Sequence, residues 1–125
     1  MSNAIPSEIK SFLEKIRRTL PNDFILRHSK KNKKTITELG FNKRLVIEEI
    51  DSLSAENYSA GPVSEIGTSN KVWIFGKIIN NREIYIKLKM IGKNNQGEER
   101  ETTYCMSFHF AEQRLNYPNK KQTGE

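Results

Sequence analysis

The chain has 125 residues, which is enough for one domain that buries a core without support from disulfides or metals. Its 21 Lys and Arg against 15 Asp and Glu give a net charge of +6, which favours nucleic acid, an anionic membrane surface or an acidic protein as partner. The single cysteine, Cys105, excludes an intramolecular disulfide and favours a reducing compartment.

The beginning of the chain offers no targeting signal. No apolar run reaches the roughly 20 residues of a membrane span, and the first residues lack the hydrophobic stretch of a signal peptide. Residues 1–5 include Ser2-Asn3-Ala4, which resembles the remnant of a purification tag. We therefore expect a single domain over residues 1–125, in the cytoplasm and without a membrane partner.

The first half of the chain predicts helices. Apolar residues recur at helical spacing between two prolines, which predicts a helix from about Ser7 to Leu20. Asp23–His28 predicts a short extended piece. A second helix is expected over Lys33–Leu39, where a glycine follows as C-cap, and a third over Asn42–Ile50.

Two other segments of this half are expected to be loops. Lys30–Lys34 contains four lysines, and we interpret it as a solvated loop slightly ahead of an RNA contact. His28, beside it, is interpreted as a surface residue. Tyr58–Asn70 is rich in Gly, Pro and Ser, which indicates a long loop.

The second half of the chain changes to the period of strands. Three strands are expected over Lys71–Ile79, Arg82–Ile91 and Arg100–Phe110, and Asn80-Asn81 can supply the positive φ angles of a two-residue hairpin turn. The last residues are expected to be irregular, with 119–125 a flexible tail. Helices followed by a meander predict an α+β fold, with the N-terminal helices packed on one face of a C-terminal antiparallel sheet.

The two-residue turn also fixes the register of the first hairpin. Trp73 then falls on the apolar side, so we interpret it as a core residue rather than a platform for stacking bases. A glycine, Gly76, falls opposite Tyr85 and leaves room for the ring to lie over the backbone. The expected partners on the other face are Gly76 with Tyr85, Ile74 with Lys87 and Val72 with Lys89.

Alternation along the strands collects chemically active side chains on this second face. The second strand contributes Tyr85, Lys87 and Lys89, and the third strand contributes Cys105, Ser107 and His109. The apolar residues of the third strand point the other way, and they are Met106, Phe108 and Phe110. We therefore predict one apolar sheet face and one face that carries groups able to exchange protons.

Such a set is suited to RNA cleavage, which needs a base, an acid and cations for the transition-state charge. Histidine has an ordinary pKa of about 6.5, close to working pH, so His109 is the candidate acid. Lys87 is expected to stabilise phosphate charge together with Lys89, and like-charged neighbours favour a neutral lysine that could serve as base. Tyr85 is expected to position the phosphate or stack on a base. The alternative is a polar sheet face whose lysines serve solubility.

Further cations of the same hairpin complete the predicted site. Lys77 and Arg82 join Lys89 as candidate RNA-binding residues. One cysteine and two histidines do not form a recognisable ligand set, so no metal is expected. No glycine motif that cradles phosphates is present, so no nucleotide cofactor is expected.

Five segments together carry a resemblance to a known family. They are Asn57–Pro62, Val72–Lys77, Glu83–Lys87, Cys105–Glu112 and Asn116–Pro118. In order and spacing they resemble the MqsR-like family of bacterial toxin–antitoxin mRNA interferases, which are relatives of the RelE-type ribonucleases. The resemblance implies a RelE-like fold and metal-independent cleavage of mRNA, free or on the ribosome, to 2′,3′-cyclic phosphate and 5′-hydroxyl ends. It also implies a cognate antitoxin.

The resemblance extends to individual positions and also shows departures. Tyr85 falls on a tyrosine that the family places at its active site, with Lys87 beside it. His109 falls where the best-known member has a lysine. Ala60 and Ile74 stand where that member has a functional lysine and a glutamine. Two alternatives stay open: a catalytically weak or inactive domain that binds RNA or an antitoxin, and an interaction module for an acidic protein.

Overall fold

The computed structural model describes residues 3–93 and 96–120. Its helices are α1 (Pro6–Thr19), α2 (Lys30–Leu39), α3 (Lys43–Asp51) and the short 3-10 helix η1 (Ala55–Asn57). Its strands are β1 (Phe24–Leu26), β2 (Tyr58–Ser64), β3 (Lys71–Ile79), β4 (Arg82–Lys93) and β5 (Glu99–Phe110). The described strands form one sheet in the order β1-β5-β4-β3-β2. The α+β prediction is therefore confirmed.

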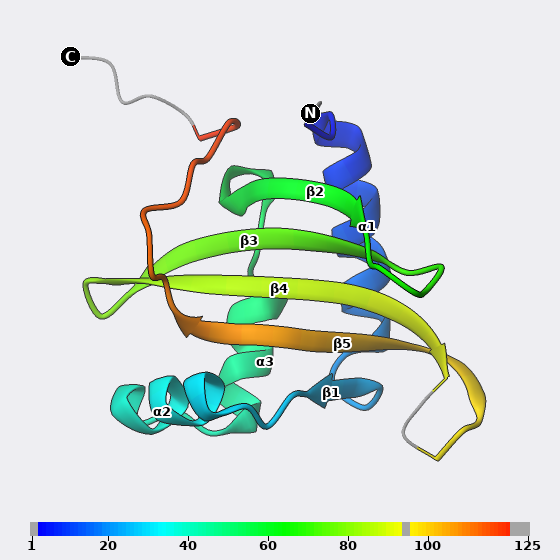
Figure 1. Ribbon diagram of the computed structural model, residues 1–125, viewed down its shortest axis with the longest axis horizontal. Helices are drawn as coiled ribbons and strands as arrows, with labels where there is room; N and C mark the ends of the chain where they lie inside the picture. The colour runs from blue at the N-terminus through cyan, green and yellow to red at the C-terminus, as the bar shows by residue number, and fades with distance from the viewer. Residues whose placement is uncertain (1–2, 94–95, 121–125) are drawn as a thin grey trace.

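The helices and the sheet form two layers (Figure 1). Helices α1 and α3 lie behind one face of the sheet, while α2 lies along its β5 side. The core between the layers is apolar, and its fully buried members include Ile9, Val46, Phe75 and Phe108. We call the opposite face, which these helices leave uncovered, the open face. No helix of the described residues is long and apolar enough to cross a membrane.

Helix α1 is held to the sheet by an aromatic stack. Its apolar residues recur at helical spacing, and the ring of Phe12 lies parallel to that of Trp73 with the centroids 4.4 Å apart. Trp73 is only 9% exposed. This low exposure confirms the assignment of Trp73 to the core. The parallel ring of Phe12 adds stabilisation beyond that of the buried area alone.

The predicted register of the β3–β4 hairpin is also confirmed. Asn80 and Asn81 have φ angles of 51° and 66°, the left-handed conformation that a two-residue turn of this type requires. The pairs expected from that turn are present, and they are Gly76 with Tyr85, Ile74 with Lys87 and Val72 with Lys89. A turn of fixed length leaves no freedom to shift the pairing by one residue.

The expectation of a loop over Tyr58–Asn70 is wrong in its first half, because Tyr58–Ser64 forms the edge strand β2. The buried ring of Tyr58 joins the core, and its hydroxyl accepts a hydrogen bond from the backbone of Ala4 at 3.0 Å. Two register irregularities interrupt the β2–β3 pairing, and Pro62 is tolerated because β2 is an edge strand. Glycine and proline therefore mark a bulged edge here.

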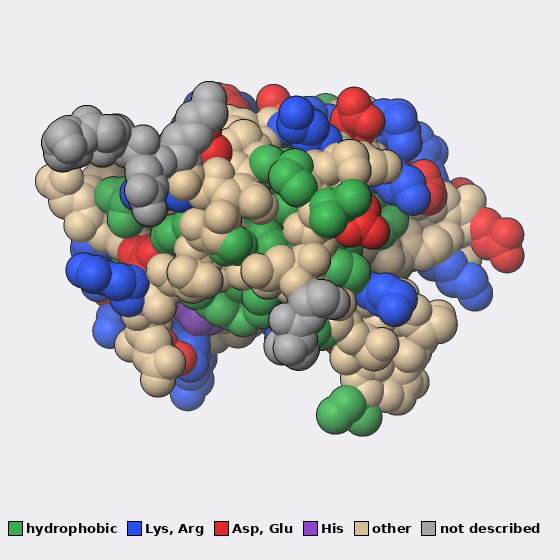
Figure 2. Space-filling model, turned by 90° about the horizontal axis from the view of Figure 1, so that it is seen from above, with side chains coloured by type: hydrophobic (Ala, Val, Ile, Leu, Met, Phe, Trp, Pro, Cys, Tyr) green, Lys and Arg blue, Asp and Glu red, His purple; other side chains and the backbone are tan. Residues whose placement is uncertain are grey.

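One residue before α1, Ala4, belongs to the packed fold. Ala4, within the segment that resembles a tag remnant, is 8% exposed and lies in the core cluster. Figure 2 looks down on the β2 side of the molecule and shows hydrophobic side chains between groups of Lys and Arg. The predicted flexible tail falls mostly on residues 121–125, which lie outside the described residues.

Strand β1 makes the sheet mixed rather than wholly antiparallel. It pairs parallel to β5, with Phe24 beside Thr103 and Leu26 beside Cys105. Helix α2 then begins at Lys30, so the cationic run predicted as a loop is helical. Ser29 caps the helix by accepting a hydrogen bond from the backbone of Asn32 at 3.1 Å. The earlier start follows from this cap.

Asn32 completes the edge of β5 beyond the end of β1. Its side-chain amide donates to the carbonyl of Met106 at 3.2 Å, and its carbonyl oxygen accepts from the backbone of Phe108 at 2.9 Å. Thr35, one turn later, accepts from the backbone of Phe110 at 3.0 Å. Both side chains are buried, so α2 satisfies backbone groups that a neighbouring strand would otherwise pair.

A β-bulge in β5 corrects the predicted position of Cys105. Lys87 pairs with Ser107, whereas Leu88 pairs with Cys105, so Met106 is the extra residue. Ser107 and His109 stay on the open face, but Cys105 turns into the core and is completely buried. Burial raises the pKa of its thiol far above the ordinary value. The prediction failed because it assumed strict alternation along the strand.

We expect Asn32→Ala to lower the free energy of unfolding by about 2–4 kcal/mol, because it leaves the N–H of Phe108 and the carbonyl of Met106 buried without partners. Urea denaturation measures the change. Thr37→Ala, on the exposed side of the same helix, is the matched control. Equal stabilities of the two variants would contradict the edge-completing role of Asn32.

Candidate functional site

The chain after β5 returns across the open face (Figure 1), and we call residues 111–120 the C-terminal strap. Glu83 of β4 anchors it through both carboxylate oxygens. One accepts a hydrogen bond from the hydroxyl of Tyr117 at 2.7 Å, and the other accepts from the backbone of Leu115 at 3.1 Å. The backbone of Ala111 donates to the carbonyl of Glu83 at 2.9 Å. The strap therefore has a fixed path over the sheet.

Gly76 provides the space in which the strap lies. A Cβ atom at this position would collide with the side chains of Leu115 and Tyr117 and would approach the carbonyl of Ile84 to 3.2 Å. The room that the sequence predicted for Tyr85 is therefore taken by the strap. Tyr85 instead stacks on His109, with the ring centroids 5.3 Å apart and the planes 16° from parallel.

The strap and the open face border a cavity of about 420 Å³ that is open to solvent on one side. Its lining consists of Tyr85, Lys87, Ser107, His109, Glu112, Gln113, Arg114 and Leu115. The structure thus brings together the three residues that the sequence assigned to catalysis. Burial raises the pKa of Tyr85 above its ordinary value, so the phenol stays neutral and offers a proton for a hydrogen bond. We call this space the His109 cavity.

The orientation of His109 is set by its own strand. Its Nδ1 lies 3.0 Å from the backbone carbonyl of Phe110. A carbonyl oxygen only accepts hydrogen bonds, so this contact requires the proton on Nδ1. Nε2 is then the nitrogen that can give or take a proton in chemistry.

Glu112 and Arg114 are members of this cavity that sequence reasoning missed. Glu112 forms an ion pair with Lys31 of α2 at 2.7 Å. The hydrogen bond from Lys31, its charge and the charge of His109 hold the pKa of Glu112 below its ordinary value. Their nearness to His109 in the sequence could have indicated them, because both follow it within five residues. The strap is irregular, so no periodicity predicts on which side their side chains lie.

The predicted RNA-binding residues lie away from the His109 cavity. Lys89 is on the open face, but it is 9% exposed and pairs with Glu65 at 2.8 Å. Its Nζ also lies 5.2 Å from the centre of the ring of Tyr104. The charge of Lys89 is therefore balanced by Glu65 within the fold. The expected pair of uncompensated like charges, which was to make one lysine a base, is not present.

Lys77 and Arg82 lie on the helix side of the sheet. Lys77 pairs with Glu49 of α3 at 2.6 Å. Arg82 pairs with Glu38 of α2 at 3.2 Å, and its guanidinium carbon lies 3.4 Å from the centre of the ring of Phe110. These contacts join the hairpin to the helices. His28 is exposed, as predicted.

The positions at which the sequence departs from the toxin pattern fall in one row with Lys87. Ala60 of β2 pairs with Ile74, Ile74 pairs with Lys87, and Lys87 pairs with Ser107. The row crosses four strands on the open face. The apolar side chains therefore occupy the approach to Lys87 from the β2 side, and polar groups reach it from β5 and the strap.

Comparison of the chain with protein-family models, with curated proteins and with solved structures found no match. The features that carry the candidate site are the stacked pair of Tyr85 and His109, the half-buried Lys87, and the charged residues of the strap.

The anchor of the strap predicts a pH dependence. Burial, the hydrogen bond to Glu83 and the charge of Glu83 raise the pKa of Tyr117 above the ordinary value of 10.0. The folded state therefore prefers the neutral phenol, and this stabilisation is present below pH 10.0 and lost as pH rises through the raised pKa. We expect the free energy of unfolding to fall more steeply above pH 10.0 in the wild type than in Tyr117→Phe.

Absorbance titration of the tyrosines provides the second measurement. Tyr117→Phe should lose one tyrosinate from the part of the titration above pH 10.0. Tyr104→Phe, which leaves the contact with Glu83 intact, should keep that late step and is the control. A titration of Tyr117→Phe that matches the wild type above pH 10.0 would rule out the anchor.

Proposed function

We propose that the chain is a metal-independent endoribonuclease that cleaves mRNA as the toxin of a bacterial toxin–antitoxin pair. One observation carries this proposal: His109, Lys87 and Glu112 line a single cavity whose wall includes the stacked ring of Tyr85. An acid, a base and a cation are the groups that RNA cleavage needs. The net charge of +6 favours the approach of a polyanion.

The proposed reaction begins with the 2′-hydroxyl of the RNA. The carboxylate of Glu112 removes its proton, and the 2′-oxygen attacks the neighbouring phosphorus. Lys87 and Arg114 stabilise the charge that develops on the phosphate oxygens. The bond from phosphorus to the 5′-oxygen breaks, and Nε2 of protonated His109 donates a proton to that oxygen. The products are a 2′,3′-cyclic phosphate and a 5′-hydroxyl.

Glu112 replaces the lysine base in this scheme for an electrostatic reason. Its pKa is held low by Lys31 first and by the charge of His109, so the carboxylate is ionised at working pH. The ion pair with Lys31 is exposed, with side-chain exposures of 59% and 68%, and exposed pairs exchange readily with solvent and substrate. The base can therefore turn toward a bound ribose.

The proposed partner besides mRNA is an acidic antitoxin that covers the open face. An inhibitor in this position would bury Lys87 and Arg114 and close the His109 cavity to RNA. Electrostatic attraction to a chain of net charge +6 would speed its association. We expect this activity in the cytoplasm, on free mRNA or on the ribosome.

The row of Ala60, Ile74 and Lys87 favours a second candidate function, a catalytically weak domain that binds RNA or an antitoxin. Ala60 and Ile74 supply no polar group at the two positions where the best-known member of the toxin family has a lysine and a glutamine. This candidate predicts RNA binding that weakens with salt and yields no product even at high protein concentration. Cleavage in the first experiment below separates the two.

The first experiment incubates the protein with a long mRNA in EDTA and maps the fragment ends. We expect discrete fragments with 5′-hydroxyl ends from the wild type. His109→Ala and Lys87→Ala should each lower the cleavage rate by at least about 10²-fold, because each removes a group that acts in the transition state. The matched controls are His28→Ala and Lys93→Ala, which change the same residue types at exposed positions elsewhere.

Circular dichroism and a thermal melt must show that the site variants stay folded. Cleavage that persists in both His109→Ala and Lys87→Ala would disprove this site assignment. The absence of cleavage by the wild type, with and without ribosomes, together with salt-dependent RNA binding, would establish the second candidate.

The pH dependence of the rate tests the role of Glu112. A base whose pKa lies below the ordinary 4.5 stays ionised throughout the neutral range, so the wild-type rate should fall on the acid side only below pH 4.5. Glu112→Gln should lower the rate by about 10²-fold across that range. Glu98→Gln, outside the cavity, is the control for a lost negative charge. A rate of Glu112→Gln within twofold of the wild type would exclude Glu112 as the base.

A further inference from the structure

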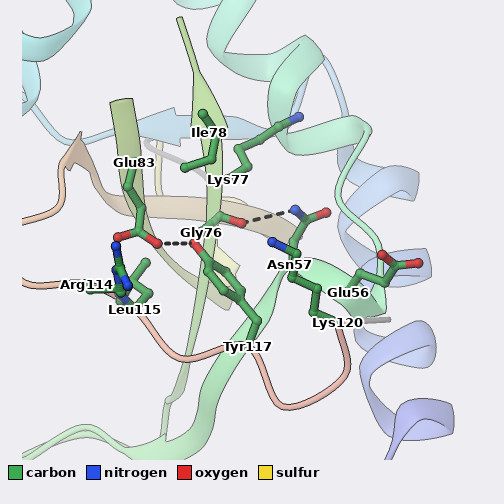
Figure 3. Close-up of a pocket in the computed structure, with 10 residues that line it drawn as sticks. All are labelled: Glu56, Asn57, Gly76, Lys77, Ile78, Glu83, Arg114, Leu115, Tyr117 and Lys120. Carbon is green, nitrogen blue, oxygen red and sulfur yellow. Dashed lines mark hydrogen bonds between the residues drawn. The ribbon is translucent and has the colours of Figure 1, made fainter. Parts of the chain in front are cut away.

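A second cavity, of about 370 Å³, lies on the other side of the strap. Figure 3 shows its lining, which consists of Glu56, Asn57, Gly76, Lys77, Ile78, Glu83, Arg114, Leu115, Tyr117 and Lys120. Arg114 and Leu115 line this cavity and the His109 cavity alike. The strap is thus a shared wall between two neighbouring spaces.

The second cavity has an apolar part, to which the ring of Tyr117 and the side chains of Ile78 and Leu115 contribute. The ring of Tyr117 lies between Glu83 and Asn57, and the backbone of Gly76 lies behind it (Figure 3). Ile78 is 61% exposed although it is a large aliphatic side chain. An aromatic ring beside exposed apolar surface is the arrangement on which single-stranded nucleic acids stack their bases.

The polar groups around the ring of Tyr117 are fixed by the fold. Asn57 donates to the carbonyl of Gly76 at 3.1 Å, and Glu83 holds the hydroxyl of Tyr117 at 2.7 Å. The ring of Tyr117 is therefore positioned before any ligand arrives, which lowers the entropic cost of stacking. Arg114 and Lys120 add positive charge at the border, where the phosphate that follows a base would lie.

We propose that this second cavity binds a nucleobase of the same RNA strand whose phosphate occupies the His109 cavity. The shared wall of Arg114 and Leu115 places the two spaces one after the other along a strand that crosses the strap. The inference rests on the proposed function, because it assumes RNA at Lys87 and His109. It adds a base-binding subsite built from Tyr117 and Ile78, which would impose a sequence preference on cleavage.

The test measures fluorescence anisotropy of short single-stranded RNAs bound to the His109→Ala protein, in which the RNA stays intact. A set of oligonucleotides carries one abasic position moved along the strand. We expect one position at which the abasic RNA binds about tenfold more weakly, the scale of one stacked base. Adding Ile78→Ser should weaken the binding of intact RNA by a similar factor. It should also abolish the loss of affinity caused by the abasic position.

The matched control is Ile66→Ser, which removes an isoleucine that is 99% exposed and outside both cavities. It should leave the affinity and the abasic penalty unchanged. If the wild type cleaves mRNA but Ile78→Ser leaves the profile of abasic-RNA binding unchanged, the subsite is overturned and the nuclease proposal stays intact. A wild-type protein that neither cleaves nor binds RNA would overturn both.

Discussion

Beyond the end of β1, the edge of β5 is completed by side chains of α2, above all by the amide of Asn32. Its donor and its acceptor pair with Met106 and Phe108 in the manner of a neighbouring strand, where β1 has already ended. This pairing fixes α2 beside the part of β5 that carries His109. It also brings Lys31 to Glu112 across the border of the cavity. A buried amide that satisfies backbone groups at both ends allows no sliding of the helix, so the position of the site follows from the edge of the sheet.

Local chemistry made much of this sheet predictable from the sequence. The Asn80-Asn81 turn specified the hairpin, and the hairpin specified which residues lie opposite Tyr85 and Lys87. Such rules act over a few residues and need no knowledge of distant contacts. The position of Cys105 could not be obtained in this way. The bulge at Met106 lies within the β4–β5 pairing and reverses which face the residues before it occupy. No glycine, proline or asparagine at this point of the sequence predicts it.

Prediction of the candidate site required tertiary information for two further features, the path of the strap and the space over Gly76. The path of the strap depends on Glu83, which lies more than 30 residues before Leu115 and Tyr117. Gly76 is compatible with a ring from its own hairpin or with the returning chain, and the sequence alone does not distinguish these. The edge strand β2 was hidden for a different reason. Its glycine and proline are tolerated where a strand is paired on one side only, so they do not exclude a strand.

The cationic side chains predicted for the site are of two kinds: those that form ion pairs within the described part of the fold, and Lys87, which forms none there and could bind a ligand. Lys77, Arg82 and Lys89 each face a carboxylate, and those carboxylates are Glu49, Glu38 and Glu65. Among the described residues no carboxylate forms an ion pair with Lys87, which is half-buried on the cavity wall. A cation in partial burial without a counter-ion gains more from an incoming phosphate than one already paired, because its new partner displaces no old one. We therefore propose Lys87 as the anion-binding position of this hairpin, and His109, which pairs with Tyr85 on the neighbouring strand, lines the same cavity.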